Sequence, residues 1–220
     1  MIKAVLFDID GTLVDSNEQH VTAWLEALAQ VGASPDRQAV HQQMGKGADM
    51  LVPALLPDAD EARIEALGKA HGAIFKERFL QGIMPFPQAG SLLARVHAAG
   101  QRVVLASSAS RGEVDHYLDL LKAQELAAAT TCSDDVENTK PAPDIFAAAL
   151  GRLDGIGPHE AIVVGDTPYD IEAAGRCGIA AIALRSGGFG DAALADAGAV
   201  EIHDDAAALL AAYDRSALAR

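Results

Sequence analysis

The sequence is poor in the residues that mark several large classes of protein. It has only two cysteines in 220 residues, Cys132 and Cys177, and they stand at no metal-ligand spacing. Both are surrounded by apolar or small residues, so we expect free, buried thiols and neither a disulfide framework nor a zinc site. Free thiols fit a reducing compartment, and we expect a cytoplasmic protein.

Long apolar runs and clustered basic residues are also missing. The longest apolar runs, such as 179–184, are far too short to cross a bilayer, and the first one stops at Asp8, which argues against a signal peptide. Lys and Arg number 17 against 31 Asp and Glu, for a formal net charge of −14. Because phosphate backbones need clustered Lys and Arg, we expect neither a nucleic-acid nor a membrane partner.

What the sequence does contain is short apolar runs, which are continuous and do not alternate with polar residues. Helix-like segments separate these runs from the second onward, and a closing helix is expected at 204–213. This alternation predicts βαβ units and a parallel sheet with helices on both faces. The predicted strands are 2–7, 101–107, 128–132, 160–165 and 179–184, with a weaker one at 199–202.

The segment between the first two runs is too long for a single crossover. Val21, Trp24, Leu25 and Leu28 recur there at helical spacing. A stretch rich in proline and glycine, 82–90, ends the helical region. We therefore predict an α/β core domain made of 1–15 and 83–220, and an α-helical cap domain at 16–82 with further helices at 36–44, 47–56 and 59–80.

Polar side chains follow the predicted strands where each strand ends. In a parallel sheet all carboxyl ends open onto one edge, and ligands of open α/β sheets bind in the crevice there. Pro143 is expected in the first turn of a helix, which places the lysine before it at this edge. We therefore expect one rim to gather residues from four distant segments: Asp8, Asp10, Ser107, Ser108, Lys140, Asp166 and Asp170.

The four carboxylates at this rim cannot all stay ionised without compensation. A divalent cation, Lys140 and one proton on Asp10 would together balance their charge. Carboxylate ligands with no His or Cys beside them favour Mg²⁺ over zinc, so the rim predicts phosphate chemistry assisted by Mg²⁺. Each residue alone also has a structural explanation. Asp166 suits the N-cap of a helix, Asp170 its first turn, and Ser107 the end of a strand or a helix cap. Their expected placement at the same sheet edge favours a ligand-binding site.

These four segments, in this order and spacing, closely resemble the motifs of the haloacid dehalogenase (HAD) superfamily. The first motif, DxDGT, stands at 8–12, and the second is Ser107. The third is Lys140 in KPAPDIF, and the fourth is GDTPYD with Asp166 and Asp170. The resemblance covers essentially the whole chain. It implies a Rossmann-like parallel sheet core, the HAD fold, with an inserted α-helical cap of the first type.

The resemblance also implies roles for the motif residues. Asp8 would be the nucleophile that forms an aspartyl-phosphate, and Asp10 the general acid and then the base. Ser107 and Lys140 would hold the transferring phosphoryl oxygens. Gly11 would let the backbone turn tightly at the reacting group.

The same resemblance implies a Mg²⁺ site. The ligands would be the side chains of Asp8 and Asp166 and the main-chain carbonyl of Asp10. Asp170 would be a support or an additional ligand.

Three other reactions of the family compete with phosphate ester hydrolysis. Dehalogenases lack the second aspartate of the first motif, which is present here as Asp10. Phosphonate hydrolases use a cap lysine, but Lys46 is expected to be exposed between glycines, a poor setting for a lowered pKa. His20 and Trp24 match positions of β-phosphoglucomutases, although they also suit a packed pair on the cap helix. The loop GKGADM lacks the arginine of such mutases, and Thr12 is the choice of phosphatases.

We therefore predict a Mg²⁺-dependent phosphatase of a small phosphate monoester, such as a sugar phosphate, because a closing cap excludes macromolecules. A sugar-phosphate mutase of the β-phosphoglucomutase type is the alternative. We expect a monomer or a weak homodimer. The candidate substrate contacts outside the central motif residues are Thr12, His20, Trp24, Lys46, Ser108 and Arg111.

Overall fold

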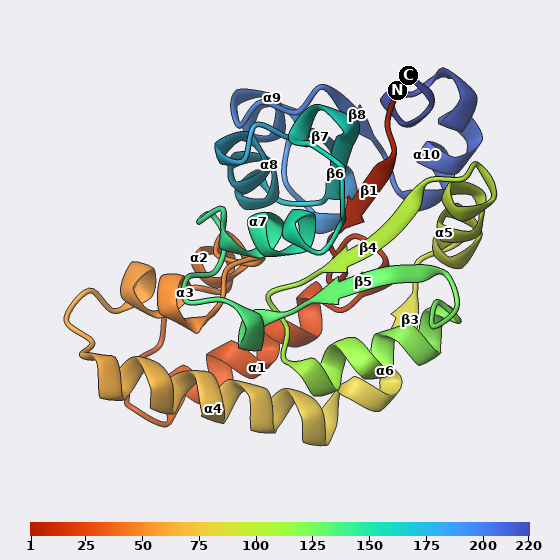
Figure 1. Ribbon diagram of the computed structural model, residues 1–220. Helices are drawn as coiled ribbons and strands as arrows, with labels where there is room; N and C mark the ends of the chain where they lie inside the picture. The colour runs from red at the N-terminus through yellow and green to blue at the C-terminus, as the bar shows by residue number, and fades with distance from the viewer.

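The six predicted strands form one parallel sheet in the computed structural model, which describes all of residues 1–220 (Figure 1). The order across the sheet is β5-β4-β1-β6-β7-β8, and every neighbouring pair is parallel. The chain moves outward in one direction from β1 to β5 and in the other direction from β6 to β8, as in a Rossmann-like sheet. The strands are β1 (Ala4–Phe7), β4 (Arg102–Ala106), β5 (Ala127–Thr131), β6 (Ala161–Gly165), β7 (Ala180–Leu184) and β8 (Glu201–His203).

Helices cover both faces of the sheet, which is why β1, β6 and β7 in its middle are apolar throughout. Val5 and Phe7 of β1 belong to a core cluster of 28 buried residues, shared with α5 (Ala89–Ala98), α6 (Arg111–Leu121) and α10 (Ala206–Ala212). Ala4 and Leu6 point to the other face, in a cluster of 17 shared with α7 (Asp144–Gly151), α8 (Pro168–Arg176) and α9 (Asp191–Asp196). The predicted α/β class with a doubly covered parallel sheet is confirmed.

The long segment between β1 and β4 is helical, as expected. It contains α1 (Asn17–Ala29), α2 (Arg37–His41), α3 (Ala48–Leu55) and α4 (Glu61–Arg78), which lie together below and to the left of the sheet in Figure 1. A separate cluster of nine buried residues, from Val21 to Leu67, holds these helices to one another. Ala23 of α1 and Phe75 of α4 belong instead to the larger core cluster, so these two helices also pack against the core.

A small antiparallel pair that was not predicted lies where the chain leaves and re-enters the core. It joins β2 (Val14–Asp15) to β3 (Met84–Pro85). A 3₁₀ turn, Leu80–Gly82, precedes β3. Strands of two residues, one of them ending in proline, are too short to produce an alternating pattern in the sequence.

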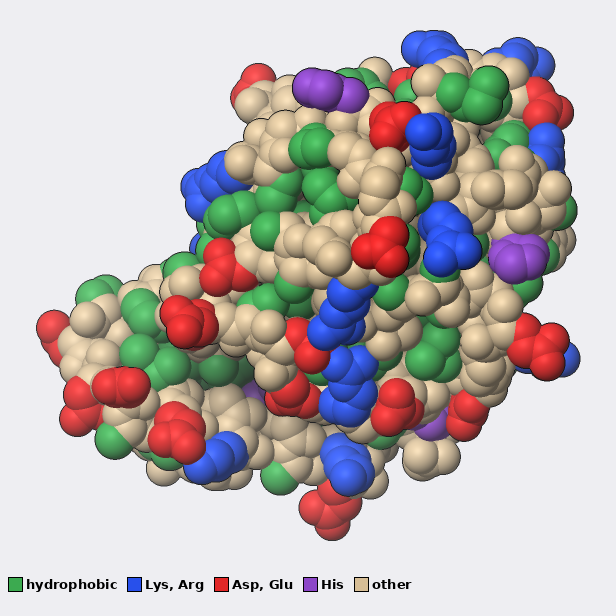
Figure 2. All heavy atoms as spheres, in the orientation of Figure 1, with side chains coloured by type: hydrophobic (Ala, Val, Ile, Leu, Met, Phe, Trp, Pro, Cys, Tyr) green, Lys and Arg blue, Asp and Glu red, His purple; other side chains and the backbone are tan.

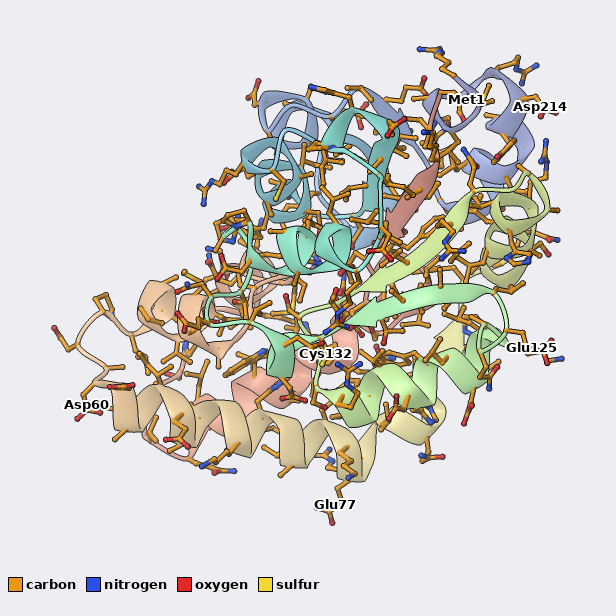
Figure 3. The ribbon with its side chains drawn as sticks, in the orientation of Figure 1. Met1, Asp60, Glu77, Glu125, Cys132 and Asp214 are labelled. Atoms are coloured by element: carbon orange, nitrogen blue, oxygen red, sulfur yellow. The ribbon has the colours of Figure 1, made fainter.

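The two cysteines are free, as expected, but only one is fully buried. Cys132 is fully buried and lies between β5 and a short 3₁₀ turn. Figure 3 shows it in the interior of the protein, in contrast to Asp60 and Glu77 at the two ends of α4, which lie at the periphery. Cys177, which follows α8, is partly exposed.

The surface is mixed in charge and exposes few large apolar side chains. On the face shown in Figure 2, Lys and Arg side chains stand beside Asp and Glu side chains. No helix combines the length with the apolar character that crossing a membrane requires. The exposed large hydrophobic residues are Met1, Val31, Met84 and Val200.

The turn after β1 needs a glycine at position 11. Gly11 has φ +79°, in the left-handed region, and a Cβ placed there would lie 2.2 Å from Oδ2 of Asp166. Gly32, which follows α1, has nearly the same backbone angle, φ +76°, but no atom lies within 4 Å of the place a Cβ would take. A side chain at position 32 would therefore meet backbone strain alone, whereas a side chain at position 11 would meet both backbone strain and crowding by Asp166.

We expect Gly11→Ala to lower the unfolding temperature more than Gly32→Ala. Both substitutions force a side chain into the left-handed region, at about 1–2 kcal/mol. Only Gly11→Ala must also displace Asp166, which adds about 1–3 kcal/mol, as in other overpacked cores. Calorimetric unfolding of both variants measures the difference. Equal losses would show that the turn accommodates a side chain beside Asp166.

Candidate active site

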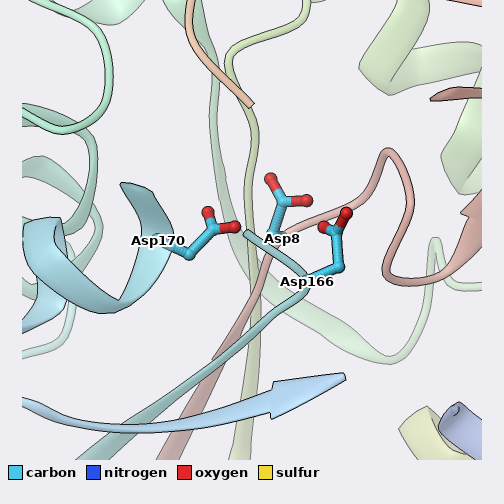
Figure 4. A group of neighbouring side chains, drawn as sticks. All are labelled: Asp8, Asp166 and Asp170. Carbon is cyan, nitrogen blue, oxygen red and sulfur yellow. The ribbon is translucent and has the colours of Figure 1, made fainter. Parts of the chain in front are cut away.

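Three buried carboxylates meet at the carboxyl ends of β1 and β6. Asp8 follows β1, Asp166 follows β6, and Asp170 lies in the first turn of α8. Each offers an oxygen within 4.8 Å of the other two, and Figure 4 shows the three side chains pointing toward one another. The chain reverses its direction of travel across the sheet at β1, so the cluster occupies the switch point where ligands of such sheets bind.

Lys140 supplies a buried positive charge to this cluster. Its Nζ forms ion pairs with Asp8 and, at 2.6 Å, with Asp170, and lies 3.4 Å from the carbonyl oxygen of Ala106. Burial alone would lower the pKa of Lys140, but the carboxylates of Asp170 and Asp8 outweigh it and raise the pKa above its usual value. The side chain therefore stays charged although it is fully buried.

Pro143, which we expected in the first turn of the helix after Lys140, lies just before that helix. The helix, α7, begins at Asp144. The difference is one residue, and Lys140 still reaches the carboxyl edge of the sheet.

The protein on its own holds too much negative charge here for all the carboxyls to be ionised. Burial raises the pKa of Asp8 to about 7 against the opposing effect of Lys140. Burial, reinforced by repulsion from Asp8 and Asp170, also raises the pKa of Asp166 well above its usual value. A divalent cation would replace the retained proton. The donor set is three carboxylates with no His or Cys among them, which fits Mg²⁺.

Two side chains from the N-terminal segment hold Asp166 in place. Thr12 Oγ1 lies 2.7 Å from one oxygen of Asp166 and 3.2 Å from Oδ2 of Asp8, and Asn17 Nδ2 donates to the other Asp166 oxygen at 3.1 Å. Thr12 is fully buried and is not part of the cavity wall, so it orients the carboxylates. The sequence analysis did not single out Asn17, because it lies after the first motif. The only sign of it in the sequence is that it is a polar residue at the start of an amphipathic helix.

Asp170 has a structural part as well as a place in the cluster. Its Oδ2 accepts hydrogen bonds from the amide of Thr167 at 3.1 Å and from the hydroxyl of Thr167 at 2.7 Å, which closes a capping box at the start of α8. The N-cap is therefore Thr167, and Asp166 is left free for the cluster. The other oxygen of Asp170 pairs with Lys140.

Asp10 is turned away from this cluster and toward the cap. Its Oδ1 accepts from Ser16 Oγ at 2.6 Å and lies 3.1 Å from His20 Nε2, while its Oδ2 lies 3.4 Å from Ser107 Oγ. Burial alone would raise the pKa of Asp10, but His20 and the Ser16 hydroxyl lower it to about 2. We expected the extra proton on Asp10, and this was wrong, because these partners stabilise its ionised form.

A cavity of about 570 Å³ lies above Asp8 and Asp10, between the cap and the core. Arg111 is not part of its wall, because its guanidinium is bound to Thr130, at 3.0 Å, and to Asp135. Of the candidate site residues, those that line the cavity are Asp8, Asp10, His20, Trp24, Lys46, Ser107 and Ser108.

Lys46 differs from the exposed lysine that we expected. It is partly buried, its Nζ donates to Gln43 Oε1 at 2.6 Å, and it lies 4.2 Å from the centroid of the Tyr169 ring. This partial burial lowers its pKa. Glycines beside a lysine do not keep it exposed when a neighbouring segment folds over it.

The cap loop that carries Lys46 is bonded to the core loops that carry the motifs. Ser108 Oγ donates to the carbonyl of Gly45 at 3.1 Å, and the amide of Thr139 donates to Asp49 Oδ2 at 2.9 Å. Gly45 and Asp49 of the cap are thus bonded to Ser108 and Thr139 of the core, which are next to the second and third motif residues. These contacts hold the cap loop against the core at the side of the cavity.

Comparison with known proteins agrees with this geometry. Residues 5–184 match the model of the haloacid dehalogenase-like hydrolase family. The chain is 30% identical over 218 residues to the phosphoglycolate phosphatase of Rhodospirillum rubrum, covering 95% of this chain and 90% of that protein. A hydrolase from Pseudomonas syringae superposes with a TM-score of 0.90 at 30% identity, covering 97% of this chain and 98% of that one.

A further solved structure, CbbY from Rhodobacter sphaeroides in complex with phosphate, has a TM-score of 0.78 at 27% identity and covers 95% of this chain and 96% of its own. The family match spans both the motifs and the cap. The chain therefore belongs to the haloacid dehalogenase-like hydrolases, in the phosphatase branch of that family.

Proposed function

We propose that this phosphatase hydrolyses a small phosphate monoester, such as a sugar phosphate, with Mg²⁺ and through an aspartyl-phosphate on Asp8. The observation that supports this most is the position of Asp8. Its carboxylate lines the cavity between the cap and the core and is paired with Lys140 beside the other two carboxylates of the cluster. A nucleophile needs access to substrate and a nearby positive charge that opposes its protonation.

In the first step an oxygen of Asp8 attacks phosphorus, and the bond from phosphorus to the ester oxygen breaks. Mg²⁺, held by Asp8 and Asp166 with Asp170 as a further ligand, would lower the pKa of Asp8 and offset the charge of the phosphoryl oxygens. Lys140 adds a fixed positive charge beside the same oxygens. The leaving alkoxide takes a proton from Asp10.

Asp10 must therefore gain a proton before this step, although its partners keep it ionised in the structure. A phosphate ester brings negative charge into the cavity next to Asp10, and a nearby like charge raises the pKa of a carboxyl. In the second step Asp10 takes a proton from water, the water oxygen attacks phosphorus, and the bond from Asp8 to phosphorus breaks. Asp8 is then free for another cycle.

The cavity volume of about 570 Å³ supports a small substrate, and the similarity to a phosphoglycolate phosphatase points the same way. The mutase alternative would need a cation in the cap for a second phosphate. Two lysines of the cap, Lys46 and Lys76, line the cavity, and Asp49 in the first turn of α3 adds a negative charge there. The cap loop GKGADM carries no arginine, which favours hydrolysis over transfer between two positions of a sugar.

We expect the protein to release phosphate from at least one member of a panel of small phosphate esters in the presence of Mg²⁺. Asp8→Asn should lower kcat at least about a thousandfold, because the amide cannot form the acyl phosphate. Asp58→Asn, at an exposed aspartate on the cap, makes the same chemical change away from the cavity and should leave kcat unchanged. Inorganic phosphate is measured over time for all three proteins.

The same panel separates hydrolysis from the alternative. With β-glucose 1-phosphate and a trace of glucose 1,6-bisphosphate, we expect phosphate to form faster than glucose 6-phosphate. Faster formation of glucose 6-phosphate would establish the mutase. No phosphate release from any ester, or full activity of Asp8→Asn, would disprove the proposed hydrolysis.

The raised pKa values of Asp8 and Asp166 predict how metal-free stability depends on pH. A carboxyl whose pKa is raised by folding stabilises the fold below its ordinary pKa, and that contribution is lost as the pH rises through the folded value, about 7 for Asp8. In chelator, the unfolding temperature should therefore fall between about pH 5 and about pH 8. The unfolding temperature should fall because the carboxyls of Asp8 and Asp166 lose their protons with no metal ion to balance their charge.

Mg²⁺ should reverse that loss and so raise the unfolding temperature more at the higher pH. At a concentration a hundredfold above the Kd the gain is about 5–10 °C. Asp166→Asn should lose most of this gain, because one ligand is missing. An equal effect of Mg²⁺ at both pH values, or an undiminished effect in Asp166→Asn, would show that the cluster does not hold the ion.

A further inference from the structure

The turn that follows β7 reaches the carboxylate cluster, although it belongs to none of the four motifs. β7 pairs with β6 in parallel, so the two strands end side by side at the carboxyl edge of the sheet (Figure 1). Asp166 follows β6, and the 3₁₀ turn Arg185–Gly187 follows β7. A fifth segment of the chain therefore lies beside one of the carboxylates that would hold the metal ion.

Gly187 packs directly against Asp166. A Cβ placed on Gly187 would lie 2.1 Å from Oδ2 of Asp166, 2.7 Å from its main-chain oxygen and 2.8 Å from its Cβ. Gly187 is buried and its φ lies outside the left-handed region, so this position requires the absence of a side chain and not an unusual backbone angle. Because Gly11 approaches the same Oδ2, main chain from two segments confines one carboxylate.

A hydrogen bond joins these two segments. The hydroxyl of Ser186 donates to the carbonyl oxygen of Gly11 at 2.6 Å. The side chains of Thr12 and Asn17 hold the two oxygens of Asp166, but only from the N-terminal segment. The Ser186 hydrogen bond adds the turn after β7 to this support, so the turn cannot move away from Asp166 without breaking that bond.

This confinement affects which cation the cluster can hold. Mg²⁺ demands six ligands in near-octahedral geometry at about 2.0–2.1 Å, whereas Ca²⁺ accepts about six to eight at about 2.3–2.6 Å and often takes both oxygens of one carboxylate. A carboxylate that is free to turn can serve either ion. Asp166 has a hydrogen bond on each oxygen and main chain against Oδ2, so it can neither turn to offer both oxygens nor move outward for a larger ion.

We propose that Ser186 and Gly187 are positioning residues that confine Asp166 and thereby make the carboxylate cluster selective for Mg²⁺ over Ca²⁺. The inference rests on the Mg²⁺ site of the proposed function and adds the turn after β7 to it. Both residues act through Asp166, Gly187 by its close approach and Ser186 by fixing the turn to Gly11. A merely structural role would weaken the binding of both ions alike, so the ratio of the two affinities is the informative quantity.

Four substitutions separate this role from a general effect on the loop. Ser186→Ala removes the hydroxyl that bonds Gly11, and Ser186→Thr keeps a hydroxyl. Gly187→Ala places a methyl group against Asp166. Gly190→Ala makes the same change three residues later, where no atom lies within 4 Å of the place a Cβ would take, and is the matched control.

The rise in unfolding temperature on titration with MgCl₂ or with CaCl₂, at one pH, gives the Kd of each ion for every variant. We expect Ser186→Ala and Gly187→Ala to raise the Kd of Mg²⁺ about tenfold, the loss typical of residues that orient a metal ligand. The Kd of Ca²⁺ should rise less than about threefold, because Ca²⁺ tolerates irregular geometry. Ser186→Thr and Gly190→Ala should keep the wild-type ratio of the two Kd values.

Three results would overturn the inference: equal weakening for both ions in Ser186→Ala and Gly187→Ala, a wild-type ratio in both, or the same loss of selectivity in Gly190→Ala. Unfolding in chelator shows whether each variant is folded before metal is added. If Gly187→Ala does not fold, Ser186→Ala, which only removes a hydroxyl, decides the outcome.

Failure of this inference can be told from failure of the proposed function. If neither ion stabilises the wild type, the proposed Mg²⁺ site fails and this inference fails with it. If Mg²⁺ stabilises the wild type and supports phosphate release, and Ser186→Ala and Gly187→Ala keep the wild-type ratio, only the role of the turn after β7 fails.

Discussion

A buried ammonium between two buried carboxylates is the interaction on which the rest of this site depends. Lys140 pairs with both Asp8 and Asp170, and all three side chains are almost completely removed from solvent. Removing one partner of such a pair leaves an uncompensated buried charge, at about 3–5 kcal/mol. These contacts therefore tie the loop after β5 to the end of β1 and the start of α8, and the charge of Lys140 opposes the rise that burial causes in the pKa of Asp8.

The two aspartates of the first motif have unlike environments, and this difference is the basis of their different roles. Asp8 faces Lys140 and the carboxylates, and burial raises its pKa to about 7. Asp10, two residues later, faces Ser16 and His20, which lower its pKa to about 2. When two titratable groups in one site have surroundings that move their pKa values apart, one can act as a nucleophile and the other as an acid and base. Here the core provides one environment and the cap provides the other.

Much of this arrangement could be predicted from the sequence, because it follows from short-range rules. Continuous apolar runs predicted a sheet buried on both faces, and parallel strands bring their carboxyl ends to one edge, so Asp8, Lys140 and Asp166 were expected together. The location of the proton was not predictable, because it depends on burial and on the partners of Asp10. The approach of Gly187 to Asp166 depends on the conformation of the turn after β7, and a two-residue pair such as β2 with β3 leaves no pattern. Arg111 follows a motif, yet α6 directs it to Asp135.

The central claim is that Asp8 becomes phosphorylated during turnover. The most direct measurement is acid quenching of the enzyme during turnover of a ³²P-labelled ester, followed by peptide mapping. The account predicts label on the peptide that contains Asp8, released by hydroxylamine as an acyl phosphate is, and stronger label in Asp10→Asn, where the second step is slowed. Label on another residue, or phosphate release with no labelled peptide in either protein, would contradict it.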